Sequence, residues 1–488
     1  MLTLADAGLW RTQAYINGAW VDAETGGTTP VHDPATGDAI ATVPRLGRAE
    51  TARAIDAAAA AFPAWRAQTA AARGAVLRRI FEAMMANQDD LARIMTAEQG
   101  KALTEARGEI AYAASFFEWC AEEAKRARGE VLPGFAPGQR IVVTKEPIGV
   151  TAGITPWNFP TAMIARKTAP ALAAGCPIII KPAEQTPLSA LALAEITQRA
   201  GLPAGLLNVV TGAAEDAPEI GLELTTNPIV RKVGFTGSTE VGKILMRQAA
   251  GTVKKVTLEL GGNAPFLVFD DADLDATLAG TLLCKFRNAG QTCISANRFL
   301  VQAGIHDAFA PRLAQAVGNL TVGNGFEDGV AIGPVIDQAG LEKIEAHVED
   351  AVSKGAKVLV GAARHPLGGT FYQPTVLADV TPDMRICHEE TFGPVVALVK
   401  FAGEDDAIRL ANDTPFGLAA YLYSRDVDRV WRVADRLEAG MIGINTGFIS
   451  SAAIPFGGVK ESGLGRYGSH EGLEEYLETK YLNFTGAF

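Results

Sequence analysis

The sequence predicts an α/β fold with two sheet-containing domains and a small extended arm. From Gly149 onward, short apolar runs such as "PIIIKP" and "LLNVVTG" alternate with helical segments such as "PLSALALAEITQRAG". A second region with the same alternation follows, with "APFLVF" and "VVALVKF" among its strands. Repeated alternation of strands and helices indicates parallel sheets of the nucleotide-binding kind, on which ligands bind at the carboxyl ends of the strands.

The composition indicates a folded, multi-domain enzyme that acts on small molecules. The chain has 488 residues, of which 48% are hydrophobic and 20% are charged, enough for more than one large core. Its net charge of −11 and the lack of a basic run argue against nucleic-acid binding, because phosphate backbones are held by clustered Lys and Arg. The N-terminal residues lack the pattern of a signal peptide, and no apolar stretch reaches the roughly 18 residues of a membrane-spanning helix. We therefore expect a cytoplasmic protein with no membrane partner.

The cysteines and histidines predict neither a disulfide framework nor a metal site. The six histidines are isolated and the five cysteines show no CxxC spacing, whereas zinc sites and disulfide frameworks depend on paired spacings. Each cysteine is interpreted as a free thiol, and most of them as small buried residues: Cys120, Cys176, Cys284, Cys293 and Cys387.

The first elements of the chain predict packing helices followed by an arm. From about 48 to 127 the sequence is Ala-rich, and its apolar residues recur at intervals of three and four, which predicts helices with no obvious chemistry. The Pro/Gly-rich segment "GEVLPGFAPGQR" then leads into "IVVTKEPIGV", which alternates like an exposed strand. This pair of segments could form an extended arm.

A Gly-rich turn, "GFTGSTEVGK" (234–243), follows a strand and opens a helix. Its glycines could let backbone N–H groups approach a phosphate at the helix N-terminus. The turn nearly fits a P-loop, but Ile244 stands where a Ser or Thr must reach Mg²⁺, and the G-x-G-x-x-G pattern is absent. A plain turn between strand and helix explains the segment about equally well.

Three further motifs carry candidate catalytic side chains. Glu259 in "LELGG" ends an apolar strand, Asn158 in "TPWNFP" follows another, and Cys293 lies in "FRNAGQTCIS". A partly desolvated carboxylate could act as a general base, a fixed amide could donate to an oxyanion, and a thiolate could act as a nucleophile. Taken singly, Glu259 is more simply interpreted as a surface residue at a strand end, and Asn158 as a turn-forming residue.

Together, these motifs resemble the aldehyde dehydrogenase superfamily over nearly the whole chain, from "INGAW" to "PFGGVKESGLGR". The motifs occur in the family's order: "TPWNFP", "KPAEQTP", "GFTGSTEVG", "LELGG", "GQTC", "EETFGP" and "PFGG". The resemblance implies oxidation of an aldehyde to a carboxylic acid through a thioester on Cys293, with Asn158 and the Cys293 N–H holding the oxyanion. Glu259 would activate the hydrolytic water, and Lys167 matches a lysine near the active site.

The same resemblance implies NAD(P) as cofactor. Trp157 would lie near the pyrophosphate, as would Ser238, which follows Gly237 in the Gly-rich turn. Lys181 would reach the adenosine ribose. Glu184 would accept hydrogen bonds from a free 2′-hydroxyl and repel a 2′-phosphate, so we expect NAD to be preferred, with NADP possible. The remaining implied contacts include those to the nicotinamide ribose and ring and are made by Thr155, Leu260, Glu390 and Phe392.

Two arginines and a serine are similar to those of the succinate-semialdehyde dehydrogenase subgroup. Arg166 and Arg287 would hold the distal carboxylate of the substrate, with Ser450 adding a hydroxyl. The alternative is that each arginine pairs with a protein carboxylate. Glutarate semialdehyde is a close rival substrate, because one methylene is discriminated only roughly 10- to 200-fold, and a broad-specificity enzyme is a further alternative. Ser295 stands where some members carry a second cysteine, so no redox switch by that route is expected.

By analogy, the chain divides into a Rossmann-type cofactor domain (1–127 and 148–260), an α/β catalytic domain (261–465) and a small β oligomerisation arm (128–147 and 466–488). An arm strand with unpaired edges needs cover from another subunit, which predicts a homodimer or homotetramer. A CoA-acylating enzyme is disfavoured by Glu259, because that reaction needs no hydrolytic base. A non-catalytic protein on the same scaffold is disfavoured by the joint presence of Cys293, Glu259 and Asn158.

Overall fold

The computed structural model describes residues 2–486, and its first domain is built on an eight-stranded sheet of order β2-β1-β9-β8-β7-β10-β11-β21. The five central strands, β9, β8, β7, β10 and β11, are parallel. Strands buried on both faces read as continuous apolar runs, as "IIIK" in β8 does. The strands are β1 (Ala14–Ile16), β2 (Ala19–Val21), β7 (Val150–Ile154), β8 (Ile178–Lys181), β9 (Leu207–Val209), β10 (Val230–Thr236), β11 (Lys255–Glu259) and β21 (Gly463–Leu464).

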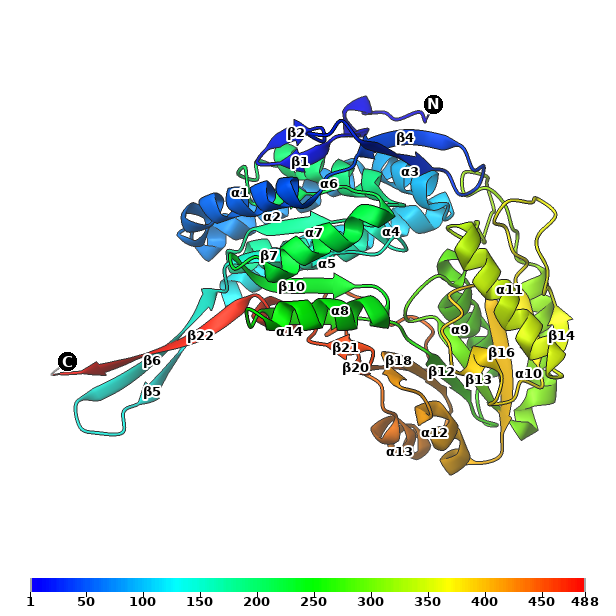
Figure 1. Ribbon diagram of the computed structural model, residues 1–488. Helices are drawn as coiled ribbons and strands as arrows, with labels where there is room; N and C mark the ends of the chain where they lie inside the picture. The colour runs from blue at the N-terminus through cyan, green and yellow to red at the C-terminus, as the bar shows by residue number, and fades with distance from the viewer. Residues whose placement is uncertain (1, 487–488) are drawn as a thin grey trace.

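Helices cover both faces of this sheet (Figure 1). Ile179 of β8 packs in a core with α1 and α7, whereas its neighbours Ile178 and Ile180 pack in the core that holds α2 to α6. This alternation follows from the period of two along a strand. The helices are α1 (Arg48–Arg66), α2 (Ala70–Ala86), α3 (Gln88–Gln99), α4 (Leu103–Glu123), α5 (Pro160–Ala174), α6 (Pro187–Arg199), α7 (Ala217–Thr226) and α8 (Thr239–Ala250). A short hairpin of β3 (Thr28–His32) and β4 (Ala39–Pro44) precedes them.

The second domain contains a seven-stranded sheet of order β14-β15-β16-β13-β12-β18-β19, in which only the edge strand β14 is antiparallel to its neighbour. Its strands are β12 (Ala264–Val268), β13 (Ala296–Gln302), β14 (Lys357–Val360), β15 (Thr375–Ala378), β16 (Val395–Phe401), β18 (Ala419–Tyr423) and β19 (Met441–Ile444). Its helices are α9 (Leu274–Phe286), α10 (Ala303–Gly318), α11 (Gln338–Ser353), α12 (Glu404–Asn412) and α13 (Val427–Arg436). A two-stranded ladder pairs β17 (Phe416–Gly417) with β20 (Val459–Lys460).

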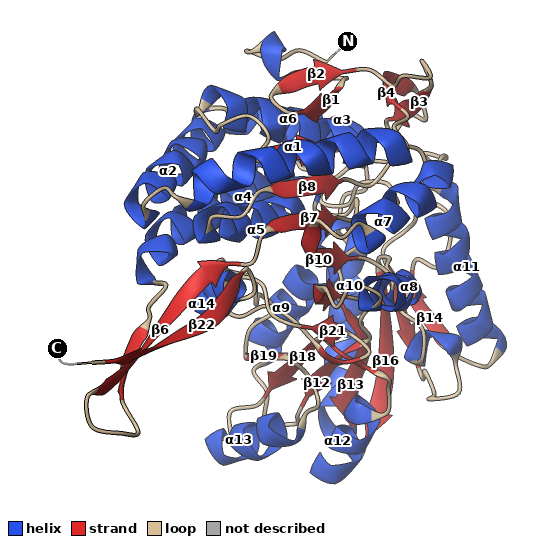
Figure 2. Ribbon diagram, turned by 60° about the vertical axis from the view of Figure 1, so that its left-hand side comes forward, coloured by secondary structure: helices blue, strands red, loops and turns tan. Residues whose placement is uncertain are grey.

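The arm is a three-stranded antiparallel sheet that projects from the first domain (Figure 2). It consists of β5 (Glu130–Pro133), β6 (Gln139–Pro147) and the C-terminal β22 (Leu477–Thr485), which pairs with β6 along its whole length. The suggested boundary near 465 lies between two elements that contact the first domain, β21 and α14 (Ser469–Glu474). The chain already returns to the first domain at β21, which pairs with β11, and α14 packs against α4 and α5.

The fold is thus an α/β architecture with two parallel sheets and a β arm. Over the described residues, no helix combines the length and the apolar character needed to cross a bilayer.

Candidate active site

The carboxyl ends of β7, β10 and β11 meet the second domain at a cavity of about 400 Å³, which we call the sheet-edge cavity. Asn158 follows β7, Glu259 ends β11, and Cys293 comes from the loop before β13. Gly262 makes close contact with the Cys293 loop: a Cβ at this glycine would lie 2.7 Å from the Cys293 carbonyl oxygen. The "LELGG" and "GQTC" motifs are therefore in direct contact, and the fold brings the three candidate catalytic side chains to one cavity.

Cys293, Glu259 and Arg166 form a hydrogen-bonded chain. The Cys293 thiol donates to Glu259 Oε1 across 3.2 Å, and Arg166 Nη1 donates to Glu259 Oε2 across 2.7 Å. Burial raises the pKa of the Cys293 thiol well above its ordinary value, and the Glu259 carboxylate raises it further, while the Arg166 charge acts in the opposite direction. The resting nucleophile is thus a protonated thiol with a carboxylate placed to accept its proton.

The Asn158 side chain lies between the two domains. Its Nδ2 donates to the Gln291 carbonyl at 3.0 Å, while its backbone oxygen accepts from Lys101 Nζ at 2.8 Å and from Asn288 Nδ2 at 2.9 Å. An amide nitrogen carries two protons. One proton therefore anchors the side chain, and the second is available for an oxyanion in the cavity.

Lys167 lies neither on the wall of the sheet-edge cavity nor on that of the second cavity, which surrounds Arg287 and is described below. It is fully buried, its Nζ donates to Thr236 Oγ1 at 2.5 Å, and it lies over the ring of Tyr467. Burial, followed by the neighbouring Arg166 charge, lowers its pKa well below the ordinary value. Lys167 thus supports the end of β10. Within residues 2–486 no hydrogen bond or ion pair joins it to Cys293, and the two interact only through longer-range electrostatics.

Most of the cofactor residues suggested by the sequence line the sheet-edge cavity. Trp157 meets Phe392 edge to face, with ring centroids 5.5 Å apart. Ser238 caps the N-terminus of α8 by accepting from Val241 N, and this helix end points its free N–H groups outward, as an anion site does. The six wall residues of this group are Trp157, Gly237, Ser238, Leu260, Glu390 and Phe392.

Glu390 is the acidic residue opposite that helix end. Its Oε1 accepts from Gly262 N at 3.1 Å. Among residues 2–486 no cation lies within ion-pair distance of it, and Lys343 and Lys285 act on it only from further away. Burial raises its pKa to about 7. A carboxylate that lacks a cationic partner fits the hydroxyl groups of a ribose, which are neutral donors.

Thr155, Lys181 and Glu184 lie outside the walls of the sheet-edge cavity, near the carboxyl end of β8. Lys181 Nζ forms an ion pair with Glu184 Oε2 at 3.1 Å, and Thr155 N donates to the Lys181 carbonyl. The pair lies beside β7, on the side away from β10. The structure therefore places this trio on the same sheet edge as the cavity, one strand further along.

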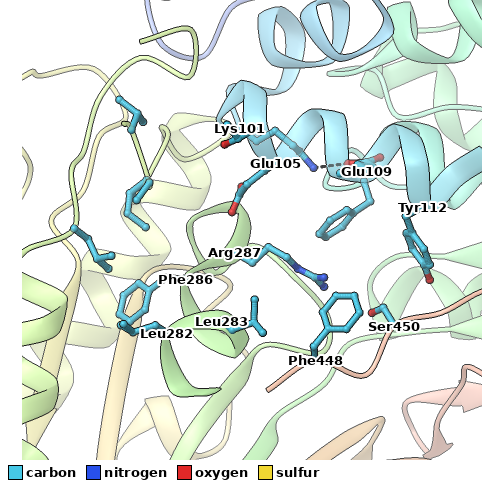
Figure 3. A pocket seen from close by; sticks show the side chains of 17 residues that line it. Lys101, Glu105, Glu109, Tyr112, Leu282, Leu283, Phe286, Arg287, Phe448 and Ser450 are labelled. Carbon is cyan, nitrogen blue, oxygen red and sulfur yellow. Dashed lines mark hydrogen bonds and ion pairs between the residues drawn. The ribbon is translucent and has the colours of Figure 1, made fainter. Parts of the chain in front are cut away.

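A second cavity of about 560 Å³ surrounds Arg287, and we call it the Arg287 cavity (Figure 3). The guanidinium of Arg287 lies between the rings of Phe159 and Phe448, 5.1 and 5.5 Å from their centroids. Ser450 lies on the same wall. Among the described residues, no carboxylate forms an ion pair with Arg287. Glu105 lines the same cavity and acts on Arg287 only at longer range. A cation in an aromatic cavity without an ion-pair partner is suited to an anionic ligand.

Arg166 is placed differently from the expectation that both arginines converge on one substrate channel. Its side chain is buried against Phe456 and Tyr467 and paired with Glu259, and it lies on the wall of neither cavity. A fully buried guanidinium needs a partner inside the protein, and Glu259 supplies one. The alternative considered from the sequence, pairing with a protein carboxylate, is what the structure shows for Arg166 and not for Arg287.

The region 48–127 contributes more than packing, contrary to the expectation from its sequence. Lys101 and Glu109 form a buried ion pair beside the Asn158 loop, and Glu109 also accepts from Thr161 N and Ala162 N at the start of α5. Tyr112 lines the Arg287 cavity, and its buried hydroxyl has no partner among residues 2–486. The signal in the sequence for this role was the presence of charged residues within an Ala-rich helical pattern. The spacing of these residues fits solvent-facing positions equally well.

Within the described part of the chain, no group of three or more His, Cys, Asp or Glu residues is arranged to hold a metal ion.

Comparisons with known proteins show the family of this chain. The family model described as "Aldehyde dehydrogenase family" matches residues 20–482. The chain is 60% identical to glutarate-semialdehyde dehydrogenase of Pseudomonas aeruginosa, over 99% of this chain and 100% of that protein. It is 58% identical to the NADP(+) succinate-semialdehyde dehydrogenase of Escherichia coli, over 99% of each. The solved structure of succinate-semialdehyde dehydrogenase from Burkholderia pseudomallei superposes with a TM-score of 0.98 at 60% identity, covering 99% of this chain and 100% of that one.

Proposed function

This chain belongs to the aldehyde dehydrogenase family, and we propose that it oxidises a small aldehyde with a carboxylate at its far end to the corresponding dicarboxylate. Succinate semialdehyde is the proposed substrate, and NAD(P) is the electron acceptor. The observation that carries this proposal is Arg287, which lines a cavity between two aromatic rings without a carboxylate partner among the described residues.

The first half-reaction uses Cys293 and Asn158. Glu259 accepts the thiol proton, the thiolate attacks the carbonyl carbon, and the carbonyl electron pair becomes an oxyanion held by Asn158 Nδ2 and the Cys293 N–H. NAD(P), held by the walls of the sheet-edge cavity, would supply the hydride acceptor that this carbon needs to pass from the thiohemiacetal to the thioester on Cys293. The cofactor fits the sheet-edge cavity, because the N-terminus of α8 can face the pyrophosphate and Glu390 can face a ribose.

The second half-reaction releases the acid. After it has released the thiol proton to solvent, Glu259 takes a proton from water as the water attacks the thioester, and Cys293 departs as a thiolate. Arg166 orients the Glu259 carboxylate through its hydrogen bond to Oε2, so that Oε1 faces Cys293. The presence of this base supports hydrolysis over transfer to CoA.

The substrate proposal is tested by kcat/KM for succinate semialdehyde relative to butanal, which has the same length and no carboxylate. We expect a large ratio that falls roughly 100-fold in Arg287→Ala, the effect of one charge-assisted pair of about 3 kcal/mol. A ratio near one in the unaltered enzyme would leave a general aldehyde dehydrogenase. Glutarate semialdehyde should be measured in the same assay, because the relative from Pseudomonas aeruginosa is named a glutarate-semialdehyde dehydrogenase. An enzyme distinguishes two aldehydes that differ by one methylene only weakly.

We also propose that NAD is preferred over NADP. Glu184 would accept a 2′-hydroxyl and repel a 2′-phosphate, and this is the feature that supports the choice. Lys181 partly offsets that repulsion through its ion pair with Glu184, so NADP remains a possible second cofactor. The relative from Escherichia coli is named for NADP(+), which makes the residue at this position worth testing.

We propose a homodimer or homotetramer built through the arm. The outer edges of β5 and β22 carry no further strand among the described residues, and Val131, Phe135 and Tyr481 on or beside these strands are 69%, 78% and 69% exposed. Open strand edges with apolar side chains are stable only when another chain covers them. Light scattering at micromolar concentration tests this, and a uniform monomer would refute it.

A further inference from the structure

We propose that Asn288 is a positioning residue, which sets Asn158 and Cys293 at the separation the reaction needs by tying their loops together. The inference rests on the proposed aldehyde oxidation but not on the identity of the aldehyde. It concerns a residue that lies in neither cavity wall and to which the mechanism above gives no role.

The backbone at Asn288 is the first observation. Asn288 and Ala289 have left-handed conformations, with φ of 52° and 55°, and Gly290 follows with φ of 75°. Left-handed geometry costs roughly 1–2 kcal/mol at each residue with a Cβ. Strain of this kind persists where surrounding contacts enforce it, and it gathers at functional sites. The tight reversal lies just before Cys293.

The side-chain contacts of Asn288 are the second observation. Nδ2 donates to the Asn158 carbonyl at 2.9 Å and to the Gln291 carbonyl at 3.2 Å, while Oδ1 accepts from Gln99 Nε2 at 2.9 Å. The backbone N of Asn288 donates to the Glu105 carboxylate. Both amide protons and the amide oxygen are therefore hydrogen-bonded, and the residue is only 2% exposed.

The Gln291 carbonyl is the shared acceptor that gives this network its function. It accepts from Asn158 Nδ2 at 3.0 Å as well as from Asn288 Nδ2. Asn288 thus holds both the backbone of the Asn158 loop and the carbonyl that takes one Asn158 proton. With that carbonyl fixed, the second Asn158 proton has one direction left, toward the oxyanion position beside Cys293. A donor that is misplaced by a fraction of an ångström loses most of its catalytic effect.

The test uses Asn288→Gly, because glycine adopts a positive φ without strain and removes only the side-chain contacts. Asn208→Gly is the control: Asn208 is a buried asparagine in β9 whose side chain has two described partners, Asn17 N and the Gly205 carbonyl, and it lies away from both cavities. The measurement is the rate of NADH formation in the first turnover with succinate semialdehyde, together with the Kd for NAD and the rate of Cys293 alkylation.

We expect Asn288→Gly to slow the first turnover about 10- to 100-fold, less than the roughly 10²- to 10³-fold effect of removing an oxyanion donor outright. The Kd for NAD and the alkylation rate should stay within about twofold, because neither depends on an oxyanion. In an Asn158→Ala background, Asn288→Gly should have little further effect, since it acts through Asn158.

Two results would overturn the inference: a first-turnover rate no lower than that of Asn208→Gly, or losses that multiply in the double variant. Either would make Asn288 a structural residue only. An unaltered enzyme that forms no NADH from any aldehyde would instead refute the proposed function and the inference with it, so the two failures are distinguishable.

Discussion

The Glu259 carboxylate accepts a hydrogen bond from the Cys293 thiol, with Oε1 and Sγ 3.2 Å apart. The two residues are 34 positions apart in the sequence and belong to different domains. This contact gives Glu259 two tasks, since the same carboxylate that would activate water also faces the nucleophile and disfavours its ionised form.

Glu259→Gln should therefore separate the two tasks. Removing the negative charge should lower the pKa of the Cys293 thiol, so the pH profile of alkylation by iodoacetamide should move to lower pH. Thioester hydrolysis should fall about 10²- to 10⁴-fold, as expected for loss of a general base. Alkylation at a series of pH values measures the first effect. Stopped-flow NADH formation compared with steady-state turnover measures the second, because it separates thioester formation from hydrolysis. An alkylation profile that moves to higher pH would contradict the assigned contact.

Arg166→Met should slow thioester hydrolysis. Without the guanidinium, the buried Glu259 carboxylate loses the group that fixes its Oε2, so the base is less well aligned and the rate of hydrolysis should fall about 10- to 100-fold. Succinate semialdehyde and butanal should be affected alike. A loss confined to carboxylate-bearing aldehydes would instead place Arg166 at the substrate.

Glu390 should make cofactor binding depend on pH near neutrality. Its pKa is raised by burial from 4.5 to about 7, so it is protonated below that pH and loses acceptor capacity for a ribose. The Kd for NAD should increase as the pH falls from 8 to 6 through about 7, and Glu390→Gln should flatten the profile. The sign for folding is the opposite. The folded state binds the proton more tightly, so ionisation of Glu390 reduces stability as the pH rises from 4.5 to about 7.

The buried ion pair between Lys101 and Glu109 should be sensitive to the loss of one partner. Lys101→Met leaves a buried carboxylate without its cation, which typically costs about 3–5 kcal/mol in the free energy of unfolding. Adding Glu109→Gln should recover part of that loss, because the uncompensated charge is removed. Urea denaturation at one protein concentration measures this. Lys357→Met, at an exposed pair with Asp379, is the control and should show no measurable change.

Glu184→Ala should raise the preference for NADP. The substitution removes the carboxylate that would repel a 2′-phosphate and frees Lys181 from its ion pair, so that the ammonium can pair with the phosphate. The ratio of kcat/KM with NADP to that with NAD should increase at least about 10-fold, the effect of roughly 1.4 kcal/mol. An unchanged ratio would show that cofactor choice is made elsewhere on the sheet edge.

The sequence by itself determined the α/β class with its two sheets, the family resemblance, and the placing of Cys293, Glu259 and Asn158 around one cavity. The α/β class follows from local patterns, because apolar runs predict strands, and Asn158 and Glu259 follow or end strands, which predicts that they lie at the sheet's carboxyl edge. The place of Cys293 beside them was implied by the family resemblance, since Cys293 precedes its own strand, β13. The tertiary structure alone showed that Arg166 pairs with Glu259, 93 positions away, and that Arg287 lines the aromatic cavity. It also showed that Lys101 and Asn288 support the Asn158 loop. A side chain's partner depends on which groups burial brings within hydrogen-bond distance, and the chain order of buried charges does not contain that information.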